Sequence, residues 1–469
     1  MKKIFSLMAA MAILLSVTAF VGCSDDSKRS KYTIEGTLDA ANRTINAKME
    51  LDFYNDTQSE LETLAFHLYP NAYKEGGSLT GADTSAAFSQ GKSFGGIDVS
   101  GVTVDGKEAR FEIEGDIMTV AIPAVMPTQR TSVSMNFSVL LPQAAHRLGY
   151  LEGKYNLGNW YPVLCAFDTE WKTHPYYVFG DPFDSTVADY RVSLSYPEEL
   201  KAVSTGGVGE NGVLNVSADN VRDFAVVIGD FNIKSANVNG IKINYCTEGE
   251  EDYTPLITEA ITFFSDMFGN YAYKEYSVVK TAFYSGGMEY PALCYISDVL
   301  DEKAVEEVII HETAHQWWYA AVGNDQVNEA WLDEGLTEYS TTVFYEKHPD
   351  YGVKRESRIA DSLTSYSLYC EIYAHGEQQP MRKCVGDYVN NAEYTFNAYV
   401  RGQIMIDSTR ILIGDGAFFD GLKLYYKLYS GKVAKAEDFV GAMEKASGRN
   451  LQSYFEGWLS GKAHLYSVS

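Results

Sequence analysis

Two histidines stand four positions apart in the stretch VIIHETAHQWW, residues 308–318, and a glutamate directly follows the first. Residues at this spacing lie about 40° apart around an α-helix, so His311 and His315 would face the same way. Two neutral imidazoles can then bind one metal. Zn²⁺ suits them because it accepts nitrogen and oxygen donors and can keep one position open for water. Glu312 would stand beside that water and accept its proton. A buried helix that happens to contain histidine is the alternative interpretation.

The elements around this motif must hold the histidines in place. Asp301 is a suitable N-cap, and Gly323 with Asn324 supplies a stop, so we expect one helix of about 20 residues between them. After a break at residues 323–327, Asn328 can cap a second helix that runs to about residue 348.

A catalytic zinc site needs a third protein ligand, and the second predicted helix carries three acids. These are Asp333, Glu334 and Glu338, and Glu334 lies 19 positions beyond His315. If the second helix folds back along the first, one of these acids reaches the metal. Acids on a helix also commonly form a solvated face, and position alone does not choose between the two interpretations.

The residues around Glu334 carry a family resemblance. HExxH followed after 18 residues by a glutamate, inside WLDEGLTEY, is similar to the aminopeptidase N family of gluzincin zinc metallopeptidases. The resemblance implies one Zn²⁺ per chain, held by His311, His315 and Glu334, with Glu312 as the catalytic base. It also implies an α+β fold in which an antiparallel β domain precedes a thermolysin-like, mostly helical catalytic domain.

A second motif lies upstream of the histidines. The family has a glycine, methionine, glutamate, asparagine motif here, and GGMEY supplies Gly286, Gly287, Met288 and Glu289, with Tyr290 in place of asparagine. By resemblance, Glu289 holds the free α-amine of the substrate. A peptide can add to an edge strand of this kind by main-chain hydrogen bonds, and glycine lets the two backbones approach.

A third motif follows the zinc ligands. The family has a tyrosine followed two residues later by lysine and then glycine, and AYVRGQIM supplies Tyr399 with Arg401 and Gly402, 65 positions after Glu334. By resemblance, the Tyr399 phenol would donate a hydrogen bond to the tetrahedral oxyanion. Tyr394 is the competing candidate.

Short alternating runs such as RTINAKMELDFYN fill residues 32–240 and predict a largely antiparallel β domain. Helical spacing dominates residues 241–469, the predicted catalytic domain. AFHLYPNAY and GNWYPVL resemble the family's N-terminal domain, and RNLQSYFEGWL resembles the end of its catalytic domain. Only ten residues remain from Ser460, so we expect the helical C-terminal domain of long members to be missing and the active site to be more open.

The resemblance does not supply every part of the site. The family's arginine-rich motif with a proline, cysteine and acid cluster is not recognisable, although CAFDTEW occupies a comparable place. Asp168 and Glu170 in that stretch are candidates for a second acid that binds the substrate amine. Together with Tyr290, this departure leaves strict aminopeptidase specificity open.

The N-terminus predicts an exported lipoprotein. Lys2 and Lys3 precede an apolar run over residues 4–21, and Gly22 stands just before Cys23. Residues 1–22 resemble a lipoprotein signal, Cys23 would carry the lipid, and residues 23–31 would form a tether. Plain secretion is the alternative, and small and polar residues make a transmembrane anchor less favourable. We therefore expect a lipid-anchored, extracytoplasmic location in the cell envelope.

Charge and cysteine content limit the partners. Thirty-eight basic residues against 63 acids give a net charge of −25, which argues against nucleic acid and against electrostatic binding to anionic lipid. Five cysteines follow Cys23, and an odd number cannot all pair. Cys370 and Cys384 are the nearest pair and could close a loop, whereas isolated buried thiols are expected for the rest.

These features predict zinc-dependent hydrolysis of peptide bonds, with N-terminal residues released from peptides that have a free N-terminus. An endopeptidase with the same zinc chemistry is one alternative. A lipid-anchored protein that binds peptides without cleaving them is another, but every position that the chemistry requires is filled.

Overall fold

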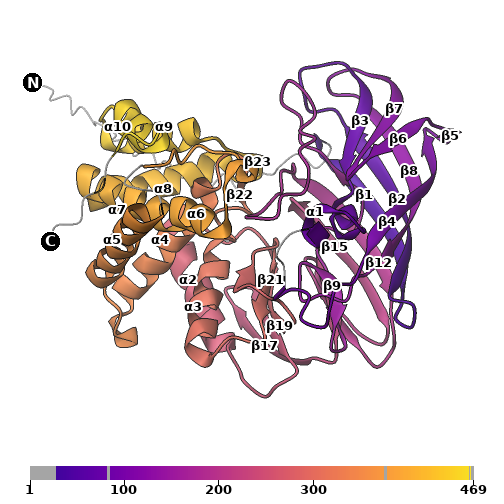
Figure 1. The fold of residues 1–469 in the computed structure, drawn as a ribbon, viewed down its shortest axis with the longest axis horizontal. Helices are drawn as coiled ribbons and strands as arrows, with labels where there is room; N and C mark the ends of the chain where they lie inside the picture. The colour runs from indigo at the N-terminus through magenta and orange to yellow at the C-terminus, as the bar shows by residue number, and fades with distance from the viewer. Residues whose placement is uncertain (1–27, 82–84, 374–377, 464, 466–469) are drawn as a thin grey trace, which may run out of the picture.

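The computed structural model describes residues 28–81, 85–373, 378–463 and 465. Figure 1 shows a β-rich N-terminal half beside a helical C-terminal half, which confirms the predicted α+β class. The signal sequence and Cys23 lie outside the described residues.

Three sheets build the N-terminal half. The first has seven strands in the order β15-β12-β1-β2-β8-β4-β5. Its strands are β1 (Ser30–Asp39), β2 (Thr44–Tyr54), β4 (Gly96–Val104), β5 (Lys107–Glu108), β8 (Arg130–Leu140), β12 (Ala188–Ser195) and β15 (Val213–Val221). Alternate residues of β2, from Ile45 to Phe53, are buried, as the period-two pattern predicts. One face of this sheet therefore covers the core.

Two smaller sheets complete this half. The four-stranded sheet has the order β11-β3-β7-β6, and the five-stranded sheet has the order β14-β13-β16-β10-β9. Their strands are β3 (Leu61–His67), β6 (Phe111–Glu114), β7 (Ile117–Val125), β9 (Leu148–Leu151), β10 (Lys154–Leu157), β11 (Val163–Leu164), β13 (Lys201–Ser204), β14 (Gly207–Gly209) and β16 (Val226–Gly229).

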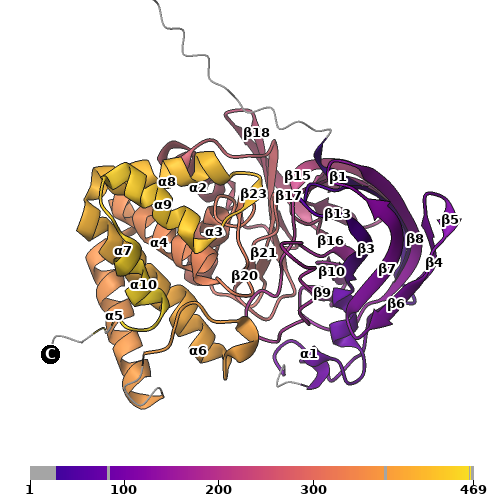
Figure 2. The ribbon, with the colours of Figure 1, turned by 90° about the horizontal axis from the view of Figure 1, so that it is seen from above.

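A further five-stranded sheet supports the helical half, in the order β17-β18-β19-β21-β20. Its strands are β17 (Asn232–Val238), β18 (Ile241–Thr247), β19 (Glu275–Thr281), β20 (Gly287–Met288) and β21 (Leu293–Ser297). Strands β17 and β18 form a hairpin, and the division expected after Gly240 falls in its turn. Figure 2 shows β18, β20 and β21 between the helices and the N-terminal sheets.

Helices α2 (Thr254–Phe268) and α3 (Glu302–Ala314) pack on this sheet. The helices that follow include α4 (Trp331–Lys347), α5 (Arg355–Ile372), α6 (Asn391–Thr395), the π-helical η5 (Phe396–Val400), α7 (Arg401–Ile413), α8 (Asp415–Tyr429), α9 (Ala436–Ser447) and α10 (Gln452–Leu459), and the short α1 (Ser78–Gly81) lies in the N-terminal half. None of the helices in the described part of the chain combines the length and apolar character needed to cross a membrane.

Two helix predictions need correction. The first helix ends at Ala314 and does not continue to Gly323, because the chain turns at His315, whose ring bonds to the Trp318 carbonyl. The second helix begins at Trp331, so Asn328 does not cap it. Asn328 instead belongs to a turn in which its main-chain N–H donates to the Asp325 carboxylate.

The cysteine pairing is also wrong. Cys370 and Cys384 are both free thiols, as are Cys165, Cys246 and Cys294. The Cys384 thiol lies against the Tyr177 hydroxyl, and the Cys370 sulfur contacts the amide of Gln378.

Arg222 joins the two halves of the molecule. Its buried guanidinium donates to the carbonyls of Ser185, Tyr319 and Lys432. Gly323 provides the space, because a Cβ there would overlap the guanidinium. This one side chain from the N-terminal half thus satisfies main-chain carbonyls just beyond the end of α3 and in β23 (Lys432–Val433).

Candidate metal and substrate site

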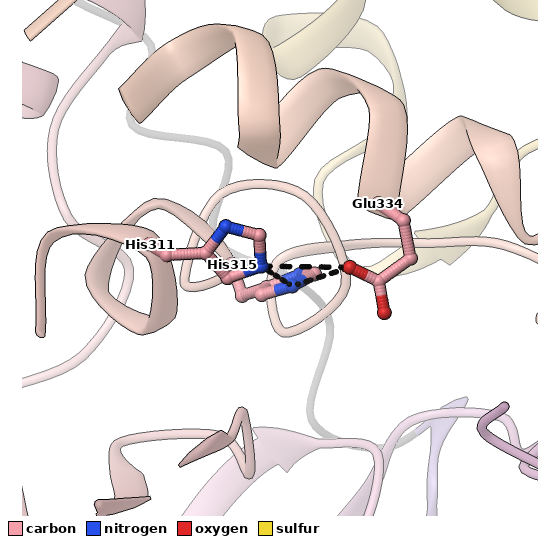
Figure 3. A group of neighbouring side chains, drawn as sticks. All are labelled: His311, His315 and Glu334. Carbon is pink, nitrogen blue, oxygen red and sulfur yellow. Dashed lines mark hydrogen bonds and ion pairs between the residues drawn. The ribbon is translucent and has the colours of Figure 1, made fainter. Parts of the chain in front are cut away.

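The structure brings together the three residues predicted as metal ligands. His311 lies in the last turn of α3, His315 is the residue that caps its C-terminal end, and Glu334 lies in the first turn of α4. The Nε2 atoms of the histidines are 3.2 Å apart, and Glu334 Oε2 lies 3.5 Å from His311 Nε2 and 3.2 Å from His315 Nε2 (Figure 3). The Asp301 side chain caps α3 as predicted, accepting from Ala304 N at 2.9 Å.

The other ring nitrogens are held by the surrounding protein. His315 Nδ1 lies 2.9 Å from the Trp318 carbonyl and 3.1 Å from Thr337 Oγ1. His311 Nδ1 lies 3.3 Å from Glu338 Oε2, and Arg358 donates to the other oxygen of Glu338. Such partners fix the orientation of metal-binding histidines. Both Nε2 atoms are therefore directed to one point.

The electrostatics of this cluster suit a cation. Burial lowers the pKa of His311, but the carboxylates of Glu334 and Glu338 raise it to about 10. Burial raises the pKa of Glu334, but the two neighbouring histidines hold that pKa well below its usual range. Glu334 Oε2 is buried, and among the described residues it meets the two histidine Nε2 atoms and no other hydrogen-bond donor. Two imidazole nitrogens and one carboxylate oxygen form the three-ligand set of a catalytic zinc site.

Glu312 lies over the edge strand β20. A Cβ at Gly287 would overlap the Glu312 carboxylate, so glycine is needed there to let the helix and strand approach. Burial raises the pKa of Glu312 to about 8, and its Oε2 has no hydrogen-bond partner among the described residues. A bound dication would favour its ionised form.

The GGM segment occupies the position expected for a peptide-binding edge. Gly287 and Met288 form β20, which pairs with β21 at the end of the sheet order. The Gly286 carbonyl accepts from Ser297 N at 2.9 Å and holds the start of the strand in place.

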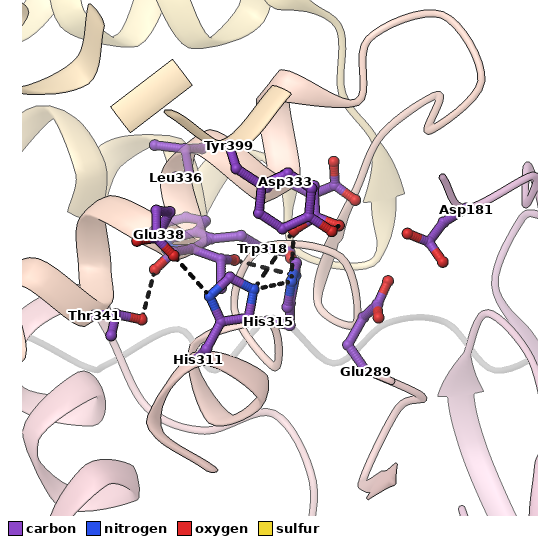
Figure 4. A network of polar contacts seen from close by, with 12 residues as sticks. Asp181, Glu289, His311, His315, Trp318, Asp333, Leu336, Glu338, Thr341 and Tyr399 are labelled. Carbon is purple, nitrogen blue, oxygen red and sulfur yellow. Dashed lines mark hydrogen bonds and ion pairs between the residues drawn. The ribbon is translucent and has the colours of Figure 1, made fainter. Parts of the chain in front are cut away.

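Glu289 follows directly and is only 4% exposed. Its Oε1 accepts from Gln326 Nε2 at 3.0 Å, and the same amide donates to Asp333 at 2.7 Å. Asp181, from the N-terminal half, lies beside it. Ligand oxygens of Asp181, Glu289 and Glu334 are all within 4.8 Å of one another, and Figure 4 shows the first two carboxylates to one side of the histidines.

Asp181 was not predicted. The candidates from CAFDTEW lie elsewhere: Asp168 is 57% exposed at its side chain and pairs with Lys435, and Glu170 is exposed. Asp181 stands in a Gly-Asp-Pro sequence that indicates only a turn. No local pattern distinguishes it from other acids, and only the fold places it in the site.

Tyr399 reaches the metal site, whereas Arg401 does not. The Tyr399 hydroxyl donates to Glu334 Oε1 at 2.6 Å, from the π-helical turn η5. Burial raises its pKa well above the usual range, which keeps the phenol protonated. Tyr394 also lines the cavity, but no hydrogen bond between described residues joins it to the metal cluster. Arg401 points away and donates to the carbonyls of Gln379 and Ala463.

These residues line one cavity of about 250 Å³. Acidic, aromatic and histidine side chains dominate its lining. The N-terminal half contributes Arg147, Val178, Gly180 and Asp181, and the helical half contributes Phe283, Tyr284, Ser285, Gly287, Glu289, His311, Glu312, His315, Glu334, Asn391, Tyr394, Thr395 and Tyr399.

Comparisons with known proteins point to one family. Residues 255–458 match the model of the peptidase family M1 domain. Aminopeptidase N of Escherichia coli is 29% identical over 265 residues, which span 50% of this chain and 29% of that protein. Aminopeptidase B of Homo sapiens is 24% identical over 55% of this chain and 42% of its own length. The chain thus matches less than half the length of these relatives.

Solved structures match over nearly the whole chain. The M1 zinc metallopeptidase of Deinococcus radiodurans superposes with a TM-score of 0.69, covering 94% of this chain and 96% of that one at 16% identity. The two share their fold. A mutant of the Deinococcus protein has been solved bound to a Tyr-Ser-Ala substrate.

Proposed function

We propose that this chain is a zinc-dependent aminopeptidase of peptidase family M1, the family whose domain model matches residues 255–458. The observation that carries the proposal is the pair of buried carboxylates, Asp181 and Glu289, beside the His311–His315–Glu334 cluster. One oxygen of Asp181 accepts from Arg147, and one oxygen of Glu289 accepts from Gln326. No hydrogen bond or ion pair between described residues reaches the second oxygen of either carboxylate. Two such oxygens suit the ammonium group of a peptide N-terminus.

Separate groups of residues bind the substrate and the metal. Glu289 and Asp181 hold the substrate amine, and the backbone of Gly286, Gly287 and Met288 aligns the chain along β20. Zn²⁺, when bound by His311, His315 and Glu334, supplies Lewis acidity that polarises the scissile carbonyl and makes water a better nucleophile. These assignments place the first peptide bond beside the metal ligands.

Glu312 then transfers a proton, and Tyr399 stabilises the negative charge of the oxyanion. Glu312 accepts a proton from the attacking water and returns it to the leaving amine. The Tyr399 phenol donates a hydrogen bond to the oxyanion that forms at the carbonyl carbon. Its present acceptor, Glu334 Oε1, shows that the hydroxyl lies beside the metal ligands.

An endopeptidase with the same zinc chemistry is the second candidate. It would need room for chain on both sides of the scissile bond. The buried acids at one end of the cavity favour a free amine there, since an internal peptide would leave Glu289 without a charged partner and Asp181 paired only with Arg147. A protein that binds peptides without cleaving them is disfavoured by the presence of both Glu312 and Tyr399.

Replacing Glu289 with glutamine tests the amine site. We expect kcat/KM for a dipeptide amide with a free N-terminus to fall by about 10- to 100-fold, the effect of losing a charge-assisted hydrogen bond. The N-acetylated form of the same substrate should lose little. Asp168→Asn, an exposed acid outside the cavity, is the matched control and should leave both rates unchanged. An equal loss on free and acetylated substrates would contradict the assigned role.

We also propose that the protein is anchored by lipid at Cys23 on the extracytoplasmic side of a bacterial envelope. The basic start, the apolar run and Gly22 before Cys23 support this. Cys23→Ser should abolish labelling by a radioactive fatty acid and move the protein from the membrane fraction to a soluble one. Labelling that survives the substitution would refute the anchor.

A further inference from the structure

We propose that Arg358 of α5 is a positioning residue that sets how tightly the site binds zinc. No hydrogen bond or ion pair between described residues joins Arg358 to a metal ligand, so it acts through Glu338, whose carboxylate meets the His311 ring. The inference rests on the zinc site of the proposed function. It concerns the affinity for the metal and not the cleavage step.

Glu338 connects the arginine to the metal site. Its Oε2 lies 3.3 Å from His311 Nδ1 (Figure 4), and its Oε1 accepts from Arg358 at 2.8 Å. A carboxylate on the outer nitrogen of a metal-binding histidine fixes the orientation of the ring and makes it a better ligand. The group that holds Glu338 at the ring therefore affects the affinity for zinc.

Arg358 binds both helices that carry the ligands. Besides Glu338 on α4, its guanidinium donates to Glu307 on α3 at 2.6 Å. Glu307 lies one helical turn before His311. Glu338 lies one helical turn after Glu334. One rigid fork from a third helix thus joins α3 to α4, one turn away from a ligand on each.

The guanidinium is itself held in place. Its Nε donates to Thr342 Oγ1 at 2.9 Å, and its plane lies over the ring of Tyr345, 5.4 Å from the ring centre. The side chain is only 15% exposed. A cation near the N-terminal end of a helix is disfavoured by the helix dipole, so α5 itself gains nothing from Arg358 there. These contacts give Glu338 one fixed partner.

Lysine at this position separates geometry from charge. It keeps the positive charge, but its ammonium is a single point on a flexible stem and cannot take the place of a planar fork. It can reach one of the two acids while leaving the other and Thr342 without their donor. Removing the charge altogether would favour a nearby dication and would oppose the effect of lost positioning. Arg358→Lys is therefore the informative variant.

The test measures the zinc dissociation constant by competition with a chelator of known affinity. Arg358→Lys should raise this constant about 10-fold, the lower end of the effect of disturbing the partner of a metal-binding histidine. Its kcat at saturating zinc should stay within a few fold of wild type, because the groups that transfer the proton and bind the oxyanion are unchanged.

Arg355→Lys is the matched control. Arg355 lies three residues earlier on α5, is 17% exposed and pairs with Asp407 on α7, which carries no metal ligand. This variant should bind zinc as wild type does. An equal weakening of zinc binding in Arg355→Lys would show a general effect on the fold and would refute the proposal.

Glu338→Ala tests whether the arginine acts through this carboxylate. Alone, it should raise the zinc dissociation constant about 10- to 100-fold. Adding Arg358→Lys to it should change the constant by less than about twofold, because residues that act through one contact are not additive. A full further 10-fold rise in the double variant would contradict the assigned path.

A surface variant guards against loss of folding. Glu307 is 43% exposed, so Glu307→Gln should fold, free one end of the fork and raise the zinc dissociation constant about two- to fivefold, the value of a partly exposed ion pair. Glu306→Gln makes the same charge change next to it and should have no effect. Thermal melting identifies any variant that does not fold.

The outcomes separate this inference from the proposed function. If Glu307→Gln and a folded Arg358→Lys both bind zinc as wild type does, the positioning role is refuted while the zinc peptidase stands. A wild type that binds zinc but cleaves no peptide would refute the proposed function, and the zinc affinities would still decide the inference. A wild type that binds no zinc would refute both.

Discussion

Replacing Glu312 with glutamine is expected to leave zinc bound and to lower kcat by about 10²–10⁴-fold. The amide has nearly the shape of the carboxylate but cannot accept the proton of the attacking water. Glu312 is not one of the three residues that converge on the metal position, so metal content should stay at one per chain. Metal analysis and the rate on an aminoacyl fluorogenic amide measure the two effects separately.

Glu306→Gln is the matched control, since it makes the same change on the same helix away from the cavity. It should keep wild-type activity and zinc content. If Glu312→Gln retained most of its activity with zinc in place, another group would have to be the base. If it lost zinc, the division between ligand and base would be wrong.

Replacing Tyr399 with phenylalanine should lower kcat by about 10²–10³-fold, the usual effect of removing one donor to an oxyanion. The ring, which stacks on His311 at 6.0 Å, would be kept, so KM and zinc content should change little. A loss in kcat with an unchanged KM indicates an interaction made only in the transition state.

Tyr394→Phe separates this role from a general effect of tyrosine in the cavity. Both rings line the cavity and lie 5.8 Å apart, yet only the Tyr399 hydroxyl bonds to Glu334. The kcat of the Tyr394 variant should therefore stay within a few fold of wild type, which is about the effect of losing one neutral hydrogen bond. A larger loss at Tyr394 than at Tyr399 would exchange the two assignments.

The sequence predicted the parts of the site that depend on local structure. His311 and His315 share a helical face, so their spacing predicted the pair. Glu334 was one of three acids on the next helix, and the family resemblance of its motif, not its spacing alone, selected it. The alternation in β2 likewise predicted a half-buried strand. The predicted helix is longer than α3 because a hydrogen bond between the His315 ring and the Trp318 main-chain carbonyl stabilises the turn at His315. The pattern of helix-stop residues carries no sign of that bond.

Other features arise only from contacts between distant segments. Asp181 lies 108 positions before Glu289, and nothing in its neighbourhood indicates that the two meet. Strand β1 pairs in parallel with β12, which aligns Tyr32 with Tyr190, and period-two patterns carry no such register. Spacing also suggested that Cys370 and Cys384 pair, but it says nothing about the direction of their side chains.

The Arg222 contacts have a consequence for how this protein can be divided. The family match begins at residue 255, so a fragment cut there would lack the guanidinium that satisfies the carbonyls of Tyr319 and Lys432. It would also lack the strands β17 and β18 and the acid Asp181. Leaving buried carbonyls without donors lowers the stability of the fold, so such a fragment would melt at a lower temperature than the intact protein. In the intact protein the two halves should unfold in one cooperative transition, and the substrate site should be lost at the same temperature as the fold.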